Sequence, residues 1–280
     1  MPRLQANGYE VTRLVRRPTA EAGELAWDFV EPLPPESVSG FEAVIHLAGE
    51  SIVGRWNEAK KRQILESRVG PTQRLAQALL SAKQPPKVLV CASAVGFYGS
   101  RGEEVLREES PSGGGFVAEV CRQWEAASAP AARAGMRVVN TRFGVVLSAQ
   151  GGALAKMLPP FRMGVGGKVG DGKQWMAWVD ISDVAGAILF ALNNESLRGP
   201  VNVTSPNAVR NSEFTKTLAS VLSRPAIFPM PAFAARLAFG EMANDLLLSS
   251  QHVEPAKLQA AGYAFQKPDL GQSLQSLLKK

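Results

Sequence analysis

Short apolar runs with the length of buried strands alternate with long helical stretches through the first half of the chain. The runs are EVTRLV, ELAWDF, EAVIHLAG, KVLVCASAVG and MRVVNTRFGVVL. Apolar residues recur at helical spacing over 56–82 and 116–134, which separate the last three runs. Strands that alternate with helices in this order form a parallel sheet with helices on both faces. The alternation therefore predicts an α/β fold with a doubly wound sheet.

This regular alternation ends after Ser148. Segments rich in glycine and proline follow, such as GGALAKMLPPFRMGVGGKVGDGK, and they predict loops and a short helix laid over a sheet edge. The stretch DISDVAGAILFALNN then predicts a helix with Asp180 or Ser182 as its N-cap, and GPVNVTSP predicts a strand. From Asn211 onward the pattern is mostly helical, with a proline-rich break at RPAIFPMPAF.

The composition argues against a membrane protein, a disulfide-rich protein and a metalloprotein. No run approaches the roughly 18 to 20 apolar residues of a membrane helix, and the first residues lack the apolar middle of a signal peptide. We therefore expect a cytoplasmic protein without a membrane partner. The two cysteines, Cys91 and Cys121, are expected to be reduced, and His46 and His252 are too few to build a zinc site.

The net charge of +6 does not indicate a nucleic-acid partner, because the basic residues are spread through the chain in small groups. There is no basic tail and no basic motif with interleaved aromatic residues. A solvated surface together with an anionic small ligand explains the charge. We expect a small-molecule substrate. A homodimer is one possible oligomeric state.

Several segments together resemble the extended short-chain dehydrogenases/reductases, the family of NAD-dependent epimerases and dehydratases. The resemblance is strongest to its atypical "epimerase family" branch, whose members carry a C-terminal domain of unknown function. It implies an NADP-binding Rossmann domain over 1–150 and a mixed substrate-binding region over 151–280, with 178–204 returning to the Rossmann sheet. The segments are HLAGE, SRVGPTQRL, ASAVGFYG, CRQWEAA, GGALAKMLPPFRMGVGG, QWMAWVDISDVAGAI and GPVNVTSP, and they extend over nearly the whole chain.

Two arginines at the end of the first visible strand favour NADP over NAD as the cofactor. An NAD enzyme usually has an acidic residue there, whereas an NADP enzyme uses arginine for the 2′-phosphate. Arg16 and Arg17 occupy this place, and no acidic residue occurs over 11–20. A pair of solvated arginines is the alternative. The resemblance further implies cofactor contacts at Leu47, Ala48, Gly49, Glu50, Arg68 and Arg122.

The catalytic residues that the resemblance implies are only partly present. The family uses a serine or threonine after the strand KVLVCASAVG, and Ser93 stands there. It also uses Tyr-x-x-x-Lys on the next helix, where this chain has Val117 and Cys121. Tyr98 is the best candidate acid/base, with a structural role as its alternative, and the literal Tyr-x-x-x-Lys that begins at Tyr263 is interpreted as a coincidence. The expected activity is that of an NADP(H)-dependent oxidoreductase or epimerase, and the alternative is a non-catalytic NADP(H) sensor.

The segment GKVGDGK fits the spacing of a phosphate-binding loop but continues with Gln174 in place of serine or threonine. It therefore does not predict an NTPase. In the resembling family this region closes over the substrate, which implies contacts from Arg162, Lys173 and Gln174 to an anionic substrate such as a nucleotide sugar. A charged rim on a flexible loop is the equal alternative.

The Gly-rich turn that binds the dinucleotide in this family is absent from the sequence, which opens within what reads as the first helix. The strand before such a turn is central in the sheet order of this fold. We therefore expect the second and fourth strands of the family to border a gap, and the chain to bind NADPH poorly and be marginally stable. A form extended upstream by the missing segment is expected to bind NADPH.

Overall fold

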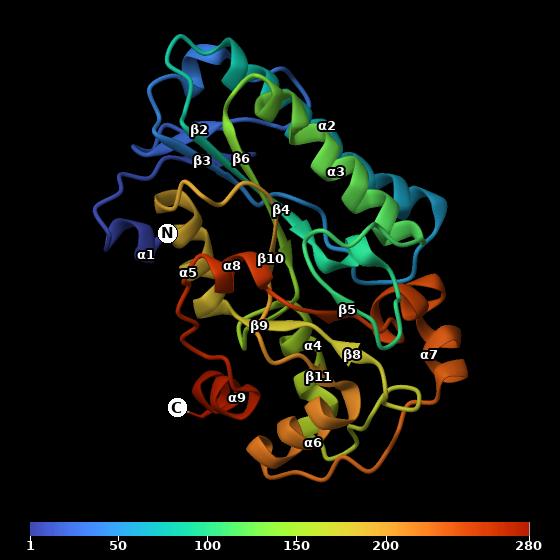
Figure 1. Ribbon diagram of the computed structural model, residues 1–280. Helices are drawn as coiled ribbons and strands as arrows, with labels where there is room; N and C mark the ends of the chain where they lie inside the picture. Colours follow the sequence, from blue (N-terminus) through green and yellow to red (C-terminus); the bar gives the residue numbers. More distant parts are fainter. Residues whose placement is uncertain (280) are drawn as a thin grey trace.

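A parallel four-stranded sheet in the order β10-β6-β4-β3 lies at the centre of the computed structural model, which describes residues 1–279 (Figure 1). Its longest strands, β4 and β6, are almost continuously buried, as in parallel sheets with both faces covered. This arrangement confirms the predicted fold class. The strands are β3 (Ala43–His46), β4 (Val88–Ala94), β6 (Arg137–Phe143) and β10 (Gly199–Val203).

Alternate side chains of β4 enter two different cores, because successive residues of a strand point to opposite faces. Leu89 and Cys91 join the apolar cluster beneath α2 (Glu58–Ser81) and α3 (Phe116–Arg133). Val88 and Val90 join the cluster beneath α5 (Ile181–Asn193) on the other face. Figure 1 shows α2 and α3 side by side over one face and α5 on the opposite side. The sheet is therefore wound on both faces, as predicted.

Side-chain caps begin two of these helices. Asn57 accepts a hydrogen bond from the backbone N–H of Lys60 at the start of α2. Asp180 accepts one from the backbone N–H of Ser182 at the start of α5, which confirms Asp180 as the N-cap. A short polar side chain at this position satisfies an N–H group that has no partner within the helix.

The run MRVVNTRFGVVL forms two strands, so the prediction of one continuous strand is wrong. The strand β6 ends before Gly144, and β7 (Val145–Leu147) leaves the central sheet to pair with β9 (Trp178–Asp180). A Cβ atom on Gly144 would lie 2.6 Å from the carbonyl oxygen of Ala177. Only glycine permits the close approach of backbones at which the chain changes sheets.

The strands β1 (Arg13–Val15) and β2 (Glu24–Ala26) pair with each other in a separate two-stranded sheet. Neither is hydrogen-bonded to β3, so within residues 1–279 one edge of β1 and one edge of β3 lack a ladder partner. Leu14 of β1 and Val44 of β3 nevertheless pack against the same apolar cluster as α2. The gap between the two sheets lies where the absence of a Gly-rich strand and turn predicts it.

The C-terminal half builds a further core from helices and short strands. Trp178 and Phe214 are fully or almost fully buried in it, together with Leu154, Leu218 and Leu274.

No helix among residues 1–279 is long and apolar enough to cross a bilayer. The other helices are α1 (Pro2–Gln5), α4 (Gly152–Arg162), α6 (Asn211–Leu222), α7 (Ala232–Phe239), α8 (Ala256–Ala260) and α9 (Leu270–Leu278), with single turns η1 (Pro35–Val38), η2 (Val95–Tyr98) and η3 (Ala243–Leu247). The other strands pair as β5 (Val105–Leu106) with β12 (His252–Val253) and β8 (Trp175–Met176) with β11 (Val209–Arg210).

Candidate functional site

The two predicted cofactor arginines differ in their surroundings at the end of β1. Arg17 donates to Glu24 over 2.8 Å and to Glu21 over 3.2 Å. Arg16 is exposed and has no hydrogen-bond or ion-pair partner among residues 1–279. A hydrogen bond from Lys60 lowers the pKa of Glu50, and the charge of Arg16 contributes to the same shift. Arg16 therefore faces the loop after β3, with its guanidinium available to an anion.

The loop after β3 is held in place by α2. A Cβ atom on Gly49 would lie 3.1 Å from Cζ of Arg68, so the backbone passes directly over this guanidinium. Arg68 donates to the carbonyl oxygen of Glu50 over 2.8 Å, and the hydroxyl of Ser67 accepts from the backbone N–H of Glu50 over 3.0 Å. Arg68 thus shapes the loop that was predicted to contact cofactor. The side chain of Leu47, at the start of this loop, is 52% exposed.

A buried network joins both predicted catalytic residues to a salt bridge. Ser93 donates to Oε1 of Glu125 over 2.7 Å, and Arg142 binds both oxygens of that carboxylate over 2.8 Å. Arg142 also donates to the hydroxyl of Tyr98 over 2.9 Å, and this hydroxyl donates to Oδ1 of Asn202 over 2.7 Å. The hydroxyls of Ser93 and Tyr98 are therefore linked through a single guanidinium and a single carboxylate.

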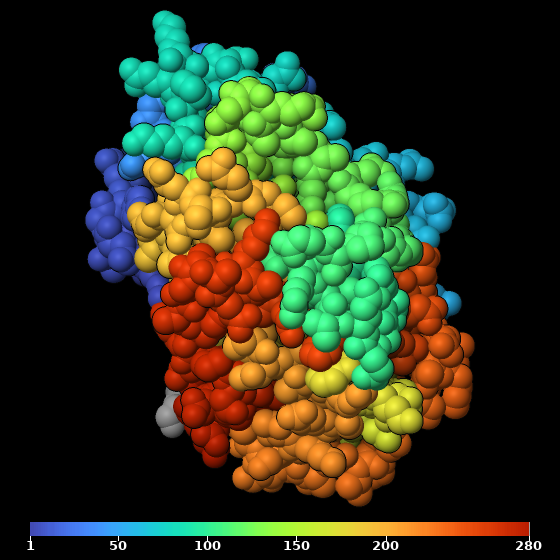
Figure 2. All heavy atoms as spheres, in the orientation of Figure 1, coloured from blue at the N-terminus to red at the C-terminus, as the bar shows by residue number. Residues whose placement is uncertain are grey.

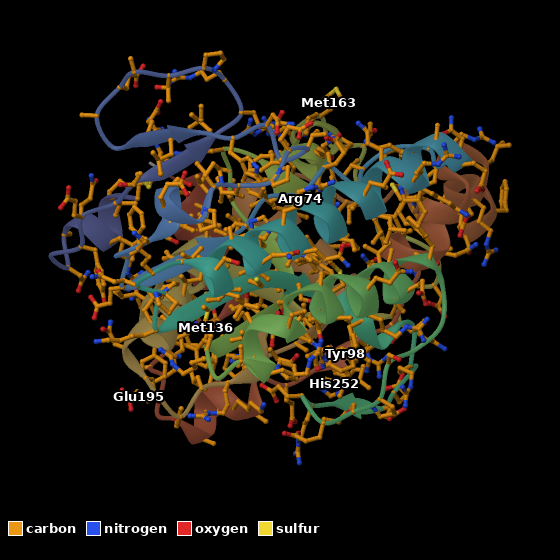
Figure 3. The ribbon with its side chains drawn as sticks, turned by 90° about the horizontal axis from the view of Figure 1, so that it is seen from above. Arg74, Tyr98, Met136, Met163, Glu195 and His252 are labelled. Carbon is orange, nitrogen blue, oxygen red and sulfur yellow. The ribbon has the colours of Figure 1, made fainter. Side chains whose placement is uncertain are left out.

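The position of Tyr98 favours the structural role over the acid/base role. Its side chain is fully buried, and Arg142 and Asn202 occupy both sides of its hydroxyl. Burial raises the pKa of Tyr98 to about 12, against the opposing effect of Arg142. The phenol therefore stays protonated at neutral pH and holds the turn η2 to β10. Tyr98 is labelled in Figure 3.

An apolar contact occupies the positions that the resemblance assigns to tyrosine and lysine. A Cβ atom on Gly96 would lie 2.3 Å from Cγ1 of Val117, so α3 packs directly on the turn η2. Cys121 lies one helical turn further along and is buried. Burial raises the pKa of its thiol to about 12, so the thiol is neutral at physiological pH. Neither side chain can exchange a proton at neutral pH as the family pair does.

The remaining predicted residues have varied surroundings. Arg122 is half exposed and pairs with Glu119 on its own helix. Gln174 is buried, and its Nε2 donates over 3.0 Å to the carbonyl oxygens of residues 169 and 247, which ties down the loop. The side chains of Arg162 and Lys173 are exposed. Cofactor contact by Arg122, and substrate contact by Arg162, Lys173 and Gln174, stay predictions.

The central members of the network, Glu125 and Arg142, are absent from the predicted site residues. Arg142 lies in a run of otherwise buried strand residues and is itself 3% exposed. A buried arginine requires a charged partner, because an isolated charge is costly in the protein interior. The arginine within the apolar run MRVVNTRF was therefore the sequence signal for a buried charge pair.

His46, the last residue of β3, is buried at the edge of the gap. It is 5% exposed, and its Nε2 has no hydrogen-bond partner among residues 1–279. Burial lowers the pKa of this imidazole to about 4. The folded protein therefore keeps His46 neutral at pH values where an exposed histidine is charged.

We expect His46 to make the protein sensitive to mild acid. Between the unfolded pKa of about 6.5 and the folded pKa of about 4, the unfolded chain binds the proton and the folded chain does not. Stability is therefore complete above this range and falls as the pH falls through it, by about 3 kcal/mol in total. Urea unfolding from pH 7.5 to pH 4.5 should show this slope, and His46→Leu should flatten it. The matched variant His252→Leu should retain it, and an unchanged slope in His46→Leu would contradict the assignment.

Comparison with known proteins extends these observations. Residues 1–204 match the model of the NAD-dependent epimerase/dehydratase family, and residues 230–277 match a domain of unknown function, DUF1731. The epimerase family protein ML0860 of Mycobacterium leprae is 38% identical over 97% of this chain and 88% of its own length.

Solved structures show the same relationship. The human epimerase family protein SDR39U1, crystallised with NADPH, superposes with a TM-score of 0.91 at 36% identity over 99% of this chain and 93% of that chain. A nucleoside-diphosphate sugar epimerase from Corynebacterium glutamicum has a TM-score of 0.80 at 38% identity over 98% of this chain and 54% of that chain. The family model covers most of the chain, and the relatives match nearly all of it. The chain therefore belongs to the NAD-dependent epimerase/dehydratase family, and its C-terminal part matches a domain of unknown function.

Proposed function

We propose that this protein binds NADP(H) and acts as an oxidoreductase or epimerase of the extended short-chain dehydrogenase/reductase type on a small anionic substrate, such as a nucleotide sugar. The observation that carries the cofactor choice is the exposed guanidinium of Arg16, which has no partner among residues 1–279 and lies at the end of β1. The human relative crystallised with NADPH, 36% identical, supports the same cofactor.

The residues present fit one end of such a cofactor better than its middle. Arg16 suits a 2′-phosphate, whereas the space beside Gly49 is occupied by the guanidinium of Arg68. Residues 1–279 contain no Gly-rich turn that opens a helix at this edge. We therefore expect these residues to contribute to NADPH binding mainly through Arg16, which discriminates NADPH from NADH.

Nicotinamide, when bound, supplies the hydride that an oxidoreductase or epimerase of this family exchanges with its substrate. In this chain Ser93 would be the hydroxyl that meets the substrate, and Glu125 accepts a hydrogen bond from it over 2.7 Å. The serine oxygen retains lone pairs that can accept a hydrogen bond from a substrate hydroxyl. Its orientation is set by Arg142 through the shared carboxylate.

Replacing Arg16 with glutamine is expected to weaken NADPH binding about tenfold and to leave NADH binding unchanged, because only NADPH carries the phosphate. Fluorescence titration with both nucleotides measures this difference. Arg17→Gln serves as the matched control, since Arg17 is engaged by Glu24, and it should have a smaller effect. Equal affinity of the unsubstituted protein for NADPH and NADH would refute the cofactor assignment.

The contact between Val117 and Gly96 favours a second candidate, a non-catalytic NADP(H) sensor. A sensor needs the cofactor site but no proton-transfer pair. Incubation with NADPH and a panel of keto sugars and nucleotide sugars separates the two functions. Turnover that is lost in Ser93→Ala supports the enzyme. Stabilisation by NADPH without any oxidation across the panel supports the sensor.

A further inference from the structure

A surface cavity lies away from the candidate cofactor site. It has a volume of about 530 Å³ and is bordered by the C-terminal half of α3, the first residues of β6 and β10, and α8. Figure 2 shows the face where these green, orange and red segments meet, and Met136, between α3 and β6, is labelled in Figure 3. The cavity is at the amino ends of the strands, whereas Arg16 and Gly49 follow their carboxyl ends.

The rim of this cavity carries positive charge that is not neutralised. Arg198 and Lys257 both line it, and neither forms an ion pair with a described residue. Their side chains donate to backbone carbonyl oxygens, Arg198 to that of Glu195 over 3.4 Å and Lys257 to that of Arg198 over 3.1 Å, while the backbone N–H of Lys257 donates to the Glu108 carboxylate over 3.1 Å. The side chain of Glu195 is exposed and lies at the periphery in Figure 3. The acid in the lining, Glu125, is already bound by Arg142.

A polar donor and apolar walls complete the cavity. Asn140 is 9% exposed, and its Oδ1 accepts from the hydroxyl of Ser128 over 3.0 Å. Its Nδ2 donates to no described residue, so this amide group can donate to an occupant. Met136, Val138 and Pro200 line the cavity with apolar atoms. Convergent donors and cations beside an apolar wall are the usual features of a site for a small organic anion.

We propose that this cavity binds a small phosphate monoester with an apolar body. A volume of about 530 Å³ is within the range of pockets for small molecules. A third cation in the lining, Arg137, is engaged by backbone carbonyl oxygens. The two other cations, Arg198 and Lys257, together with an amide donor suit a dianion better than a monoanion, and the apolar wall suits a ring or short hydrocarbon. The site is separate from the proposed cofactor site, although Glu125 contributes to its wall and also holds Ser93.

Calorimetric titration with phenyl phosphate, benzoate and benzyl alcohol tests the charge requirement on the unmodified protein. We expect saturable binding of phenyl phosphate, weaker binding of benzoate, and the weakest binding of benzyl alcohol. Raising the salt concentration should weaken the binding of phenyl phosphate more than that of the other two probes, because exposed ion pairs are screened. Absence of saturable binding of phenyl phosphate, or equal binding of benzyl alcohol, would overturn the proposal.

Variants of the rim locate the site. The double substitution R198Q/K257Q should weaken phenyl phosphate binding about tenfold or more. Ala132→Trp, at an exposed lining position, should block the cavity for all three probes. Arg133→Gln removes one positive charge beside the cavity but outside its lining, and this variant should bind phenyl phosphate as the unmodified protein does.

Two results would place the anion elsewhere. Retained affinity in both R198Q/K257Q and Ala132→Trp would show that phenyl phosphate does not occupy this cavity. Loss of affinity in Arg16→Gln would assign the anion to the end of β1, and would also overturn the proposal. Thermal unfolding of each variant checks its fold, and Ala132→Leu replaces the tryptophan variant if that variant is unfolded.

Discussion

Substitution of Arg142 by methionine is expected to lower the free energy of unfolding by about 3–5 kcal/mol, because it leaves the Glu125 carboxylate without its countercharge. The side chain of Arg142 is 4% exposed and that of Glu125 is 13% exposed, so water replaces little of the lost interaction. The hydroxyl of Tyr98 also loses a donor, and Phe97 loses the guanidinium that lies 3.5 Å from its ring centroid. Urea unfolding at pH 7 measures the change.

A second variant and a matched control test whether the unpaired carboxylate of Glu125 causes this loss of stability. Removing both charges in E125Q/R142M should recover part of the loss, because no unpaired carboxylate remains. Arg122→Met, at a half-exposed position one residue after Cys121 on α3, should have a much smaller effect. A loss of less than about 1 kcal/mol in Arg142→Met would show that Glu125 is solvated or protonated at little cost.

Restoring the family lysine on α3 is expected to destabilise the protein rather than to create an active site. Cys121 is 2% exposed and lies near Arg68, so Cys121→Lys would bury an ammonium group beside another cation. Glu125 cannot neutralise the new charge, since Arg142 already binds both of its oxygens. We expect a loss of about 4 kcal/mol at pH 7.

The pH dependence of this variant identifies the cause. The pKa of a buried lysine falls below its unfolded value of about 10.4, so the unfolded chain binds more protons at neutral pH. The stability of Cys121→Lys should therefore rise from pH 7 towards pH 9, relative to the unsubstituted protein. Arg122→Lys, on the exposed side of the same helix, should show no such rise. A defect independent of pH would indicate steric disruption instead.

The predicted architecture rested on local patterns that the fold preserves. Each of the five apolar runs contains a strand, with the last divided between β6 and β7, and GPVNVTSP contains β10. The two helical stretches became α2 and α3 with nearly the expected bounds. Asp180 caps α5 through a local hydrogen bond. Such features depend on neighbours in the chain, so periodicity and capping residues are sufficient to predict them.

The division of MRVVNTRFGVVL could not be read from its pattern. Val145 continues the apolar run, and the isolated Gly144 before it indicates a bulge or a close backbone approach but not a change of sheet. The break at Gly144 depends on Ala177, a residue far along the chain whose carbonyl oxygen approaches the glycine. A contact of this kind has no local signature in one sequence.

The roles of the site residues also depend partly on the local sequence and partly on contacts between distant residues. Arg16 and Arg17 were equivalent in the sequence, but only Arg17 meets Glu24 in the fold. Ser93 and Tyr98 were predicted as partners in catalysis, and both were found beside Arg142. Their hydroxyls meet that network because three parallel strands bring residues from distant positions to one end of the sheet.

The sequence by itself determined the α/β class, the family and the absence of a Tyr-x-x-x-Lys pair on α3, because residue order and local periodicity carry this information. Tertiary structure alone decided that Val117 closes against Gly96, that Tyr98 is buried between Arg142 and Asn202, and that a cationic cavity opens beside Asn140. These features depend on distances between side chains of different elements. Packing establishes such distances through the summed burial and hydrogen bonding of the whole core.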